Sequence, residues 1–225
     1  MSGYDYPVAL ALEDYVPVLL TGAGLALLVP YARRFGTAPV VALGAVLATA
    51  GGLSKATWKL VVALDGPDLH WLNSALFPLL CTAFLLLLYA FHRPRDARRR
   101  AALTAGLAVL FALGQGACVA VGDTWPAMAL MIVAVSVLTV RFVMLARAAG
   151  DVPAVVLFSL WQIGQYLLGP MAARADQSVT LQWVEQSCNT VAQGAFAVAT
   201  WRLAHAPGAP ISASTPASTR EVPAA

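Results

Sequence analysis

The stretch Gly51-Gly52-Leu53-Ser54-Lys55-Ala56-Thr57-Trp58-Lys59-Leu60 places two lysines inside a long apolar run. On a helix, Lys55 and Lys59 lie four residues apart and share one face, with Trp58 beside Lys59. A lysine near the centre of a transmembrane helix costs roughly 2.5–3.5 kcal/mol on insertion scales, so both side chains should face partners or water instead of lipid. The stretch therefore predicts a membrane helix that turns a polar face toward the interior of a bundle.

The rest of the chain has the composition of an integral membrane protein. Of its 225 residues, 60% are hydrophobic and 11% are charged, and the mean hydropathy is +0.74. A transmembrane helix needs about 20 mostly apolar residues, and seven segments qualify: 14–32, 39–64, 70–91, 101–121, 125–147, 153–171 and 180–203. The sequence predicts an all-α, seven-helix transmembrane domain over residues 1–205, embedded in the lipid bilayer. Residues 206–225, rich in Pro, Ala, Ser and Thr, are predicted to be a disordered cytoplasmic tail.

The charged residues predict an orientation, because arginines and acids occupy alternate connections. The arginines at one set of helix ends are Arg33, Arg34, Arg93, Arg95, Arg98, Arg99, Arg100, Arg141, Arg147 and Arg202. The acids at the opposite ends are Asp5, Glu13, Asp14, Asp65, Asp68, Asp123 and Asp176. By the positive-inside rule the N-terminus lies outside and the C-terminus in the cytoplasm of a multi-pass cell-membrane protein. The arginines form no continuous basic surface, so no nucleic-acid partner is expected.

The N-terminal region and the cysteines carry no signal for processing or metal chemistry. The acidic N-terminus lacks the basic segment of a secretory signal, so no cleavage is expected. Glu13 and Asp14 are interpreted first as solvated charges that favour a helix N-terminus. Cys81, Cys118 and Cys188 lie singly in apolar runs, which indicates structural thiols and no metal site. The sequence assigns no catalytic residue and no cofactor, and it leaves the oligomeric state open.

A stripe of polar residues marks the last apolar segment. Gln182, Glu185, Gln186, Asn189 and Gln193 recur at steps of three and four residues, which places them on one helix face. The sixth segment carries a second polar group at comparable depth, formed by Trp161, Gln162, Gln165 and Tyr166. Together with the lysines of the second segment, these residues predict a polar pocket between helices two, six and seven, in the outer half of the membrane.

The predicted ligand site comprises Lys55, Trp58, Lys59, Trp161, Gln162, Gln165, Tyr166, Glu185, Asn189 and Gln193. The lysines would attract a small anionic or zwitterionic ligand, Glu185 would act as counter-ion, and the amides would orient the ligand by hydrogen bonds. The alternative is a buried network in which the lysines pair with Glu185, Glu13 or Asp14 and the amides only join helices. Because both need a partner at similar depth, we expect Lys55 and Glu185 to lie within reach of each other, directly or through water or Lys59.

Seven helices with an outside N-terminus resemble two known plans, those of the microbial rhodopsins and of the three-one-three sugar and vitamin transporters. The last apolar segment contains no lysine, so the residue to which a rhodopsin attaches retinal is missing. A 3+1+3 arrangement draws weak support from an internal match: aligning Trp71-Leu72-Asn73 with Trp183-Val184-Glu185 brings Ala83-Phe84 onto Ala195-Phe196.

Three functions remain open at the level of sequence. The first is a small-molecule transporter or permease with an anion-tolerant pocket. The second is a membrane-embedded enzyme acting on a lipid or isoprenoid, in which Glu185 and one lysine form an acid–base pair. The third is a ligand-binding sensor or an accessory membrane subunit.

Overall fold

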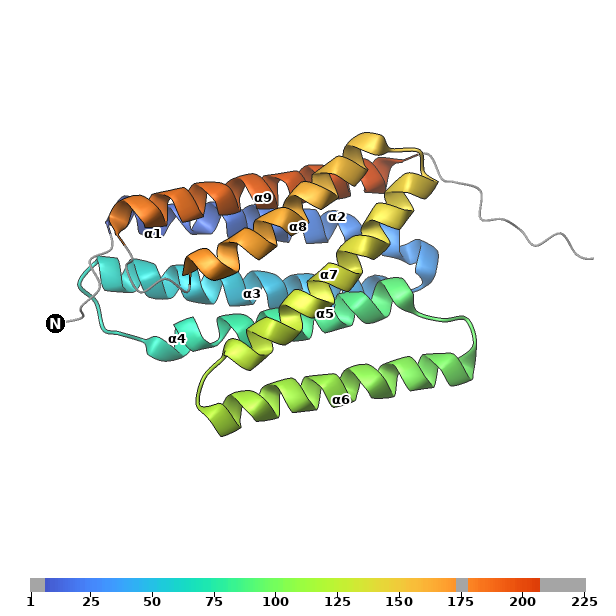
Figure 1. The fold of residues 1–225 in the computed structure, drawn as a ribbon, viewed down its shortest axis with the longest axis horizontal. Coiled ribbons are helices and arrows are strands. Elements are labelled where there is room, and N and C mark those ends of the chain that lie inside the picture. The colour runs from blue at the N-terminus through green and yellow to red at the C-terminus, as the bar shows by residue number, and fades with distance from the viewer. Residues whose placement is uncertain (1–6, 173–177, 207–225) are drawn as a thin grey trace, which may run out of the picture.

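The computed structural model describes residues 7–172 and 178–206, and these form seven helical rods of alternating direction along one long axis (Figure 1). The helices are α1 (Val8–Glu13), α2 (Tyr15–Ala32), α3 (Ala38–Ala63), α4 (His70–Ser74), α5 (Leu76–His92), α6 (Ala97–Val121), α7 (Trp125–Ala148), α8 (Val152–Ala172) and α9 (Val179–His205), with a 3-10 turn at Arg33–Phe35. The α1–α2 and α4–α5 pairs each form one rod, so the seven predicted helices are confirmed. The predicted tail lies outside the described residues, apart from Ala206.

Two prolines explain why two of the rods are interrupted. A proline inside a helix has no N–H to donate to the carbonyl four residues earlier, and its ring clashes with that carbonyl. Pro17 stands four residues after Glu13, where α1 ends, and Pro78 stands four residues after Ser74, where α4 ends. The sequence predicts the first helix over 14–32, with Pro7 to Leu12 either extending it or lying in the interface. The rod begins at Val8, so this segment extends it. Asp14 is the break inside it.

The lengths and apolarity of the rods match a membrane protein. Five of them are long and apolar enough to span a bilayer: Val8–Phe35, Ala38–Ala63, His70–His92, Ala97–Val121 and Trp125–Ala148. In α8 the apolar part is the shorter segment Val152–Leu168, and α9 is long but carries the polar stripe. The predicted all-α membrane bundle is therefore confirmed.

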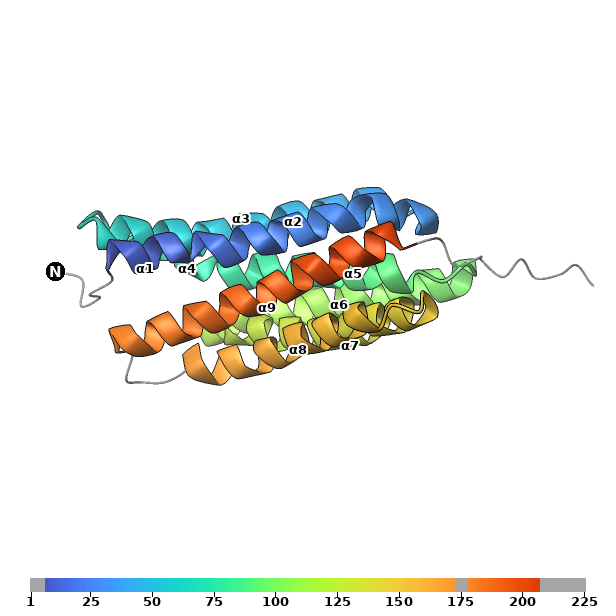
Figure 2. The same ribbon diagram turned by 90° about the horizontal axis from the view of Figure 1, so that it is seen from above.

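Six of the rods form a closed ring, and one stands outside it. Around the ring, α2 packs on α3, α3 on α5, α5 on α7, α7 on α8, α8 on α9, and α9 returns to α2. The remaining helix, α6, packs against α5 and α7 from outside the ring (Figures 1 and 2). The fourth rod is thus a peripheral linker between two sets of three, as in the 3+1+3 arrangement. The internal sequence repeat itself stays a prediction.

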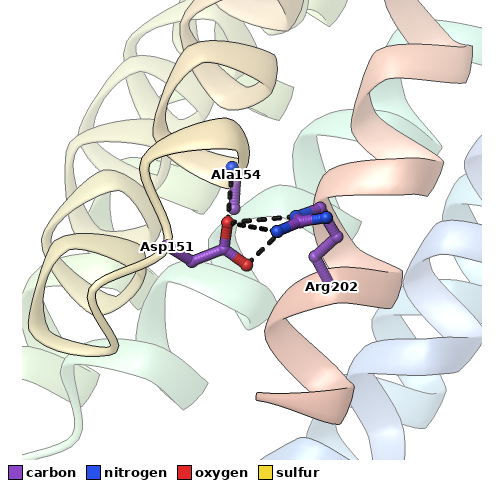
Figure 3. A network of polar contacts seen from close by, with 3 residues as sticks. All are labelled: Asp151, Ala154 and Arg202. Atoms are coloured by element: carbon purple, nitrogen blue, oxygen red, sulfur yellow. Dashed lines mark hydrogen bonds and ion pairs between the residues drawn. The ribbon is translucent and has the colours of Figure 1, made fainter.

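An acid lies at the end of the bundle that carries the arginine-rich connections. Asp151 precedes α8 and pairs with Arg202 of α9 (Figure 3). Arg202 Nε donates to both carboxylate oxygens at 3.0 and 3.1 Å. Asp151 Oδ1 also accepts from the Ala154 backbone N–H at 3.0 Å, which caps α8. One carboxylate therefore fixes the start of α8 against the end of α9.

Replacing Asp151 separates its two roles. Asp151→Asn retains a capping oxygen and loses the charge, so we expect a loss of about 1 kcal/mol, because the Arg202 side chain is 36% exposed and water screens the pair. Asp151→Ala also loses the cap and should cost about 1 kcal/mol more. Thermal unfolding in detergent measures both. The matched control is Asp96→Asn, since Asp96 caps α6 through the Arg99 N–H in an exposed position. Equal melting temperatures for wild type and Asp151→Asn would mean that the ion pair adds nothing.

Candidate functional site

A cavity of about 230 Å³ lies inside the ring, in the half of the bundle opposite the arginine-rich end. All six rods of the ring line it. Its polar lining consists of Asp14 and Thr21 from the first rod, Lys55 from α3, Gln165 from α8, and Glu185, Gln186, Asn189 and Gln193 from α9. Because an engineered cavity of about 150 Å³ accommodates benzene, this space is large enough for a small molecule.

Six of the ten predicted site residues border this cavity: Lys55, Trp161, Gln165, Glu185, Asn189 and Gln193. They come from α3, α8 and α9, the helices between which the pocket was predicted. The cavity is wider than that prediction, because α2, α5 and α7 also line it. The other four residues, Trp58, Lys59, Gln162 and Tyr166, lie elsewhere.

Gln162 and Tyr166 belong to a separate polar cluster between α7 and α8. Gln162 Oε1 accepts from Thr139 Oγ1 at 2.6 Å, and Gln162 Nε2 donates to Ser136 Oγ at 3.3 Å. Ser136 Oγ also lies 2.7 Å from the Tyr166 hydroxyl. The Tyr166 side chain is 52% exposed on the outside of the ring. These contacts join the two helices, as the alternative interpretation of the amides expected.

Trp58 closes the outer end of α3 and does not reach the cavity. Its Nε1 donates to Asp68 Oδ1 at 2.7 Å, and its ring meets the edge of His70. Trp58 is buried, so it anchors the connection between α3 and α4. This contact is local along the chain.

Lys59 forms a buried ion pair with Asp14. Lys59 Nζ lies 2.6 Å from Asp14 Oδ2, and the two side chains are only 11% and 10% exposed. The other carboxylate oxygen, Asp14 Oδ1, accepts from Gln186 Nε2. Asp14 is therefore a buried link between α3 and α9, and the interpretation of Asp14 as a solvated charge is wrong. The break before Pro17 places this acid inside the bundle.

Two further contacts secure the same break. Thr190 Oγ1 of α9 donates to Glu13 Oε1 at 2.6 Å, and the Tyr15 hydroxyl lies 3.1 Å from Thr57 Oγ1 of α3. Three consecutive residues, Glu13, Asp14 and Tyr15, thus hold the first rod to both neighbours. The spacing of Asp14 and Pro17 could have indicated a helix break, but no sequence pattern identified the partners.

Lys55 of α3 and Glu185 of α9 border the same cavity. Among the residues that the structure describes, neither side chain forms an ion pair with the other or with a third group. The expectation that they lie within reach of each other, directly or through water or Lys59, stays a prediction. The direct ion pair forms one turn farther out, at Lys59.

The floor of the cavity is a hydrogen-bonded group at the middle of the bundle. Gln193 Oε1 accepts from Trp161 Nε1 at 3.1 Å and from Thr21 Oγ1 at 3.0 Å. Gln193 Nε2 donates to Asn189 Oδ1 at 3.1 Å. Gln193 Oε1 therefore joins α9 to α2 and α8, while its Nε2 is held within α9. Gln186 differs, since its buried Oε1 accepts no hydrogen bond within the described part of the chain.

Below the floor, aromatic rings fill the other half of the ring of helices. Trp161 packs on Phe196 with ring centroids 4.4 Å apart, and Phe196 continues the series to Phe158. The series then passes through Phe142 to Phe91, with centroids 5.1 and 5.0 Å apart. These residues are almost completely buried. The cavity is therefore closed toward the arginine-rich end by a continuous aromatic column.

The fold and the site define a class of protein: a helical integral membrane protein with a charged cavity in one half of the bundle. In comparisons with known proteins, no family model, no curated protein and no solved structure matches this chain.

Proposed function

We propose that this protein is a transporter that binds a small anionic or zwitterionic solute in the cavity and carries it across the cell membrane. The observation that carries the proposal is that Lys55 and Glu185 border an internal cavity without forming an ion pair in the described part of the chain. Charges inside a membrane protein are costly, and such residues mark solute pathways. A purely structural lysine and glutamate would be expected to pair, as Lys59 and Asp14 do.

The position of the cavity supports a carrier. Its floor lies near the middle of the rods, where Thr21, Trp161 and Gln193 meet, and carriers bind their solutes near the bilayer midplane. One side is closed by the aromatic column. On the other side Asp14, which borders the cavity, contacts Lys59 and Gln186. Alternating access would require the aromatic column to open.

The aromatic column also favours a second candidate, a ligand-binding sensor. Opening a path to the arginine-rich end would separate rings that are closely packed and buried, such as Trp161 and Phe196. A sensor needs no such opening, because ligand binding alone would shift the packing of the helices. Binding without transport is the distinguishing result.

Transport by the purified full chain in proteoliposomes tests the proposal. We would measure uptake of radiolabelled leucine, glycine, lactate and succinate by counterflow. At least one solute should accumulate above protein-free liposomes, and Lys55→Met should reduce its initial rate by about tenfold or more, which corresponds to losing about 1.4 kcal/mol of binding. Saturable binding without uptake would refute the transporter and support the ligand-binding sensor. Absence of both would refute the proposed function.

Two glutamines of α8 provide a matched pair of variants for the same assay. Gln165 lines the cavity, whereas Gln162 bonds to Thr139 and Ser136 away from it. Gln165→Leu should reduce uptake, and Gln162→Leu should leave the rate per folded molecule unchanged. The reverse order would place the solute path between α7 and α8.

The cell-membrane location and the orientation belong to the same proposal and have their own test. In a variant without Cys81, Cys118 and Cys188, we would introduce Asp123→Cys or Asp96→Cys. A membrane-impermeant thiol reagent added to intact cells should label position 123 and should label position 96 only after lysis, because the arginine-rich end faces the cytoplasm. Labelling of position 96 in intact cells would invert the orientation.

A further inference from the structure

The cavity has one polar wall and one apolar wall. The polar groups come from α2, α3, α8 and α9. All four lining residues of α5 and all three of α7 are apolar, including Phe77 and Phe84 of α5 and Met131 of α7. With a fully hydrophilic solute, this apolar wall would face water or polar atoms. The free energy that burial of apolar surface contributes to binding would then be lost. The division favours a solute with a polar end and an apolar end.

The polar wall offers one charge of each sign. The Asp14 charge is balanced by Lys59, which leaves Lys55 and Glu185 as the two charges that border the cavity without an ion pair in the described residues. A simple anion would be attracted by Lys55 and repelled by Glu185, and a simple cation would meet the reverse situation. In a low-dielectric interior such a repulsion is strong. A zwitterion satisfies both charges at once.

Gln186 adds an uncharged hydrogen-bond acceptor beside Glu185. Gln186 follows Glu185 in α9, lines the cavity, and has a buried Oε1 that accepts no hydrogen bond from the described residues. An ammonium has three donors and no acceptor. The Glu185 carboxylate and Gln186 Oε1 can therefore each accept a hydrogen bond from one N–H group of a solute ammonium, while the solute carboxylate turns toward Lys55.

The size of the cavity limits the solute. Since about 150 Å³ accommodates the six carbons of benzene, 230 Å³ corresponds to about nine non-hydrogen atoms. That number is reached by an amino acid with a branched aliphatic side chain. It is exceeded by larger amphiphiles such as phospholipids.

From these four features we infer that the solute is a small zwitterion with an aliphatic group, of the size and chemistry of leucine, held with its carboxylate toward Lys55, its ammonium toward Glu185 and Gln186, and its side chain against α5 and α7. This inference rests on the proposed function of the cavity and specifies its substrate class.

The test uses leucine and three molecules that each lack one of its parts. Glycine lacks the aliphatic group, 4-methylpentanoate lacks the ammonium, and 3-methylbutylamine lacks the carboxylate. We would measure binding of radiolabelled L-leucine to the full chain in nanodiscs and competition by the other three. Leucine should bind saturably, and each of the other three should compete at least about tenfold less well, a ratio that corresponds to about 1.4 kcal/mol.

Variants of the two charged residues make the result independent of folding, because affinities are compared within one variant. Glu185→Gln should narrow or invert the preference for leucine over 4-methylpentanoate, since the repulsion of the anion is removed. Lys55→Met should narrow or invert the preference for leucine over 3-methylbutylamine, since the repulsion of the cation is removed. Gln162→Leu, outside the cavity, should leave all four relative affinities unchanged.

Each contrary result overturns a specific part. Equal binding of glycine and leucine would show that the apolar wall is not used. Equal binding of 4-methylpentanoate and leucine in the wild type would make the cavity an anion site, which refutes the zwitterion and leaves the proposed transporter standing. No binding of leucine to folded protein would refute the inference, while the proposed function would still be judged by the uptake of lactate and succinate.

Discussion

Replacing Lys59 with methionine is expected to lower the free energy of unfolding by about 3–5 kcal/mol, because removing one partner of a buried ion pair leaves the other charge uncompensated. That charge is Asp14, whose side chain is 10% exposed and which Gln186 contacts through its other oxygen. The break before Pro17 fixes Asp14 in the bundle, where it is buried between Lys59 and Gln186. The effect should be among the largest of any single polar substitution in the chain.

A double variant separates the ion pair from the packing of the lysine chain. Asp14→Asn combined with Lys59→Met removes both charges, and the asparagine can still accept from Gln186, so the double variant should recover at least about 2 kcal/mol of the loss. Reversible unfolding in mixed micelles, followed by circular dichroism, gives the four free energies of the cycle.

Lys55→Met is the matched control for this cycle. Lys55 lies one turn from Lys59 on the same helix face, but it forms no ion pair among the described residues. Its replacement should change the free energy of unfolding by less than about 1 kcal/mol, because no paired acid is left behind. If Lys55→Met lowered the free energy of unfolding more than Lys59→Met does, Lys55 would be the structural lysine and Lys59 the candidate for ligand binding.

The helices could be predicted from sequence because their signal is local. Apolar segments of membrane length separated by charged connections determine the number of helices. The bounds agree closely for 39–64 against Ala38–Ala63 and for 180–203 against Val179–His205, whereas the first rod begins at Val8, six residues before the predicted position 14. The interior breaks follow from a local rule too, since each precedes a proline by the distance of one helical hydrogen bond. The first break was missed because Pro17 is equally compatible with the first turn of a helix.

The partners inside the bundle could not be predicted, because they depend on how distant helices approach one another. Whether Asp14 meets Lys55 or Lys59 depends on the depth at which the first rod packs beside α3. Gln162 and Gln165 are three residues apart on α8, and the rotation of that helix decides which of them faces the cavity. The close approach of α8 and α9 limits this rotation: a Cβ on Gly164 would lie 2.5 Å from that of Ala192. The residue pattern within one helix does not determine how that helix is rotated against its neighbours.

Trp161→Ala is expected to cost about 3–5 kcal/mol, because it removes a large side chain that is only 1% exposed and leaves a void. The void would join the cavity to the aromatic column, since Trp161 packs on Phe196 and donates to Gln193 at the cavity floor. Trp161→Phe is the control: it keeps a ring and loses the N–H donor, while Thr21 still donates to Gln193, so the loss should stay near 1–2 kcal/mol. Thermal unfolding measures both, and leakage of a small dye from proteoliposomes should rise only for Trp161→Ala if this ring closes the path. Equal leakage for the two variants would show that the closure lies deeper, among Phe158 and the rings beyond it.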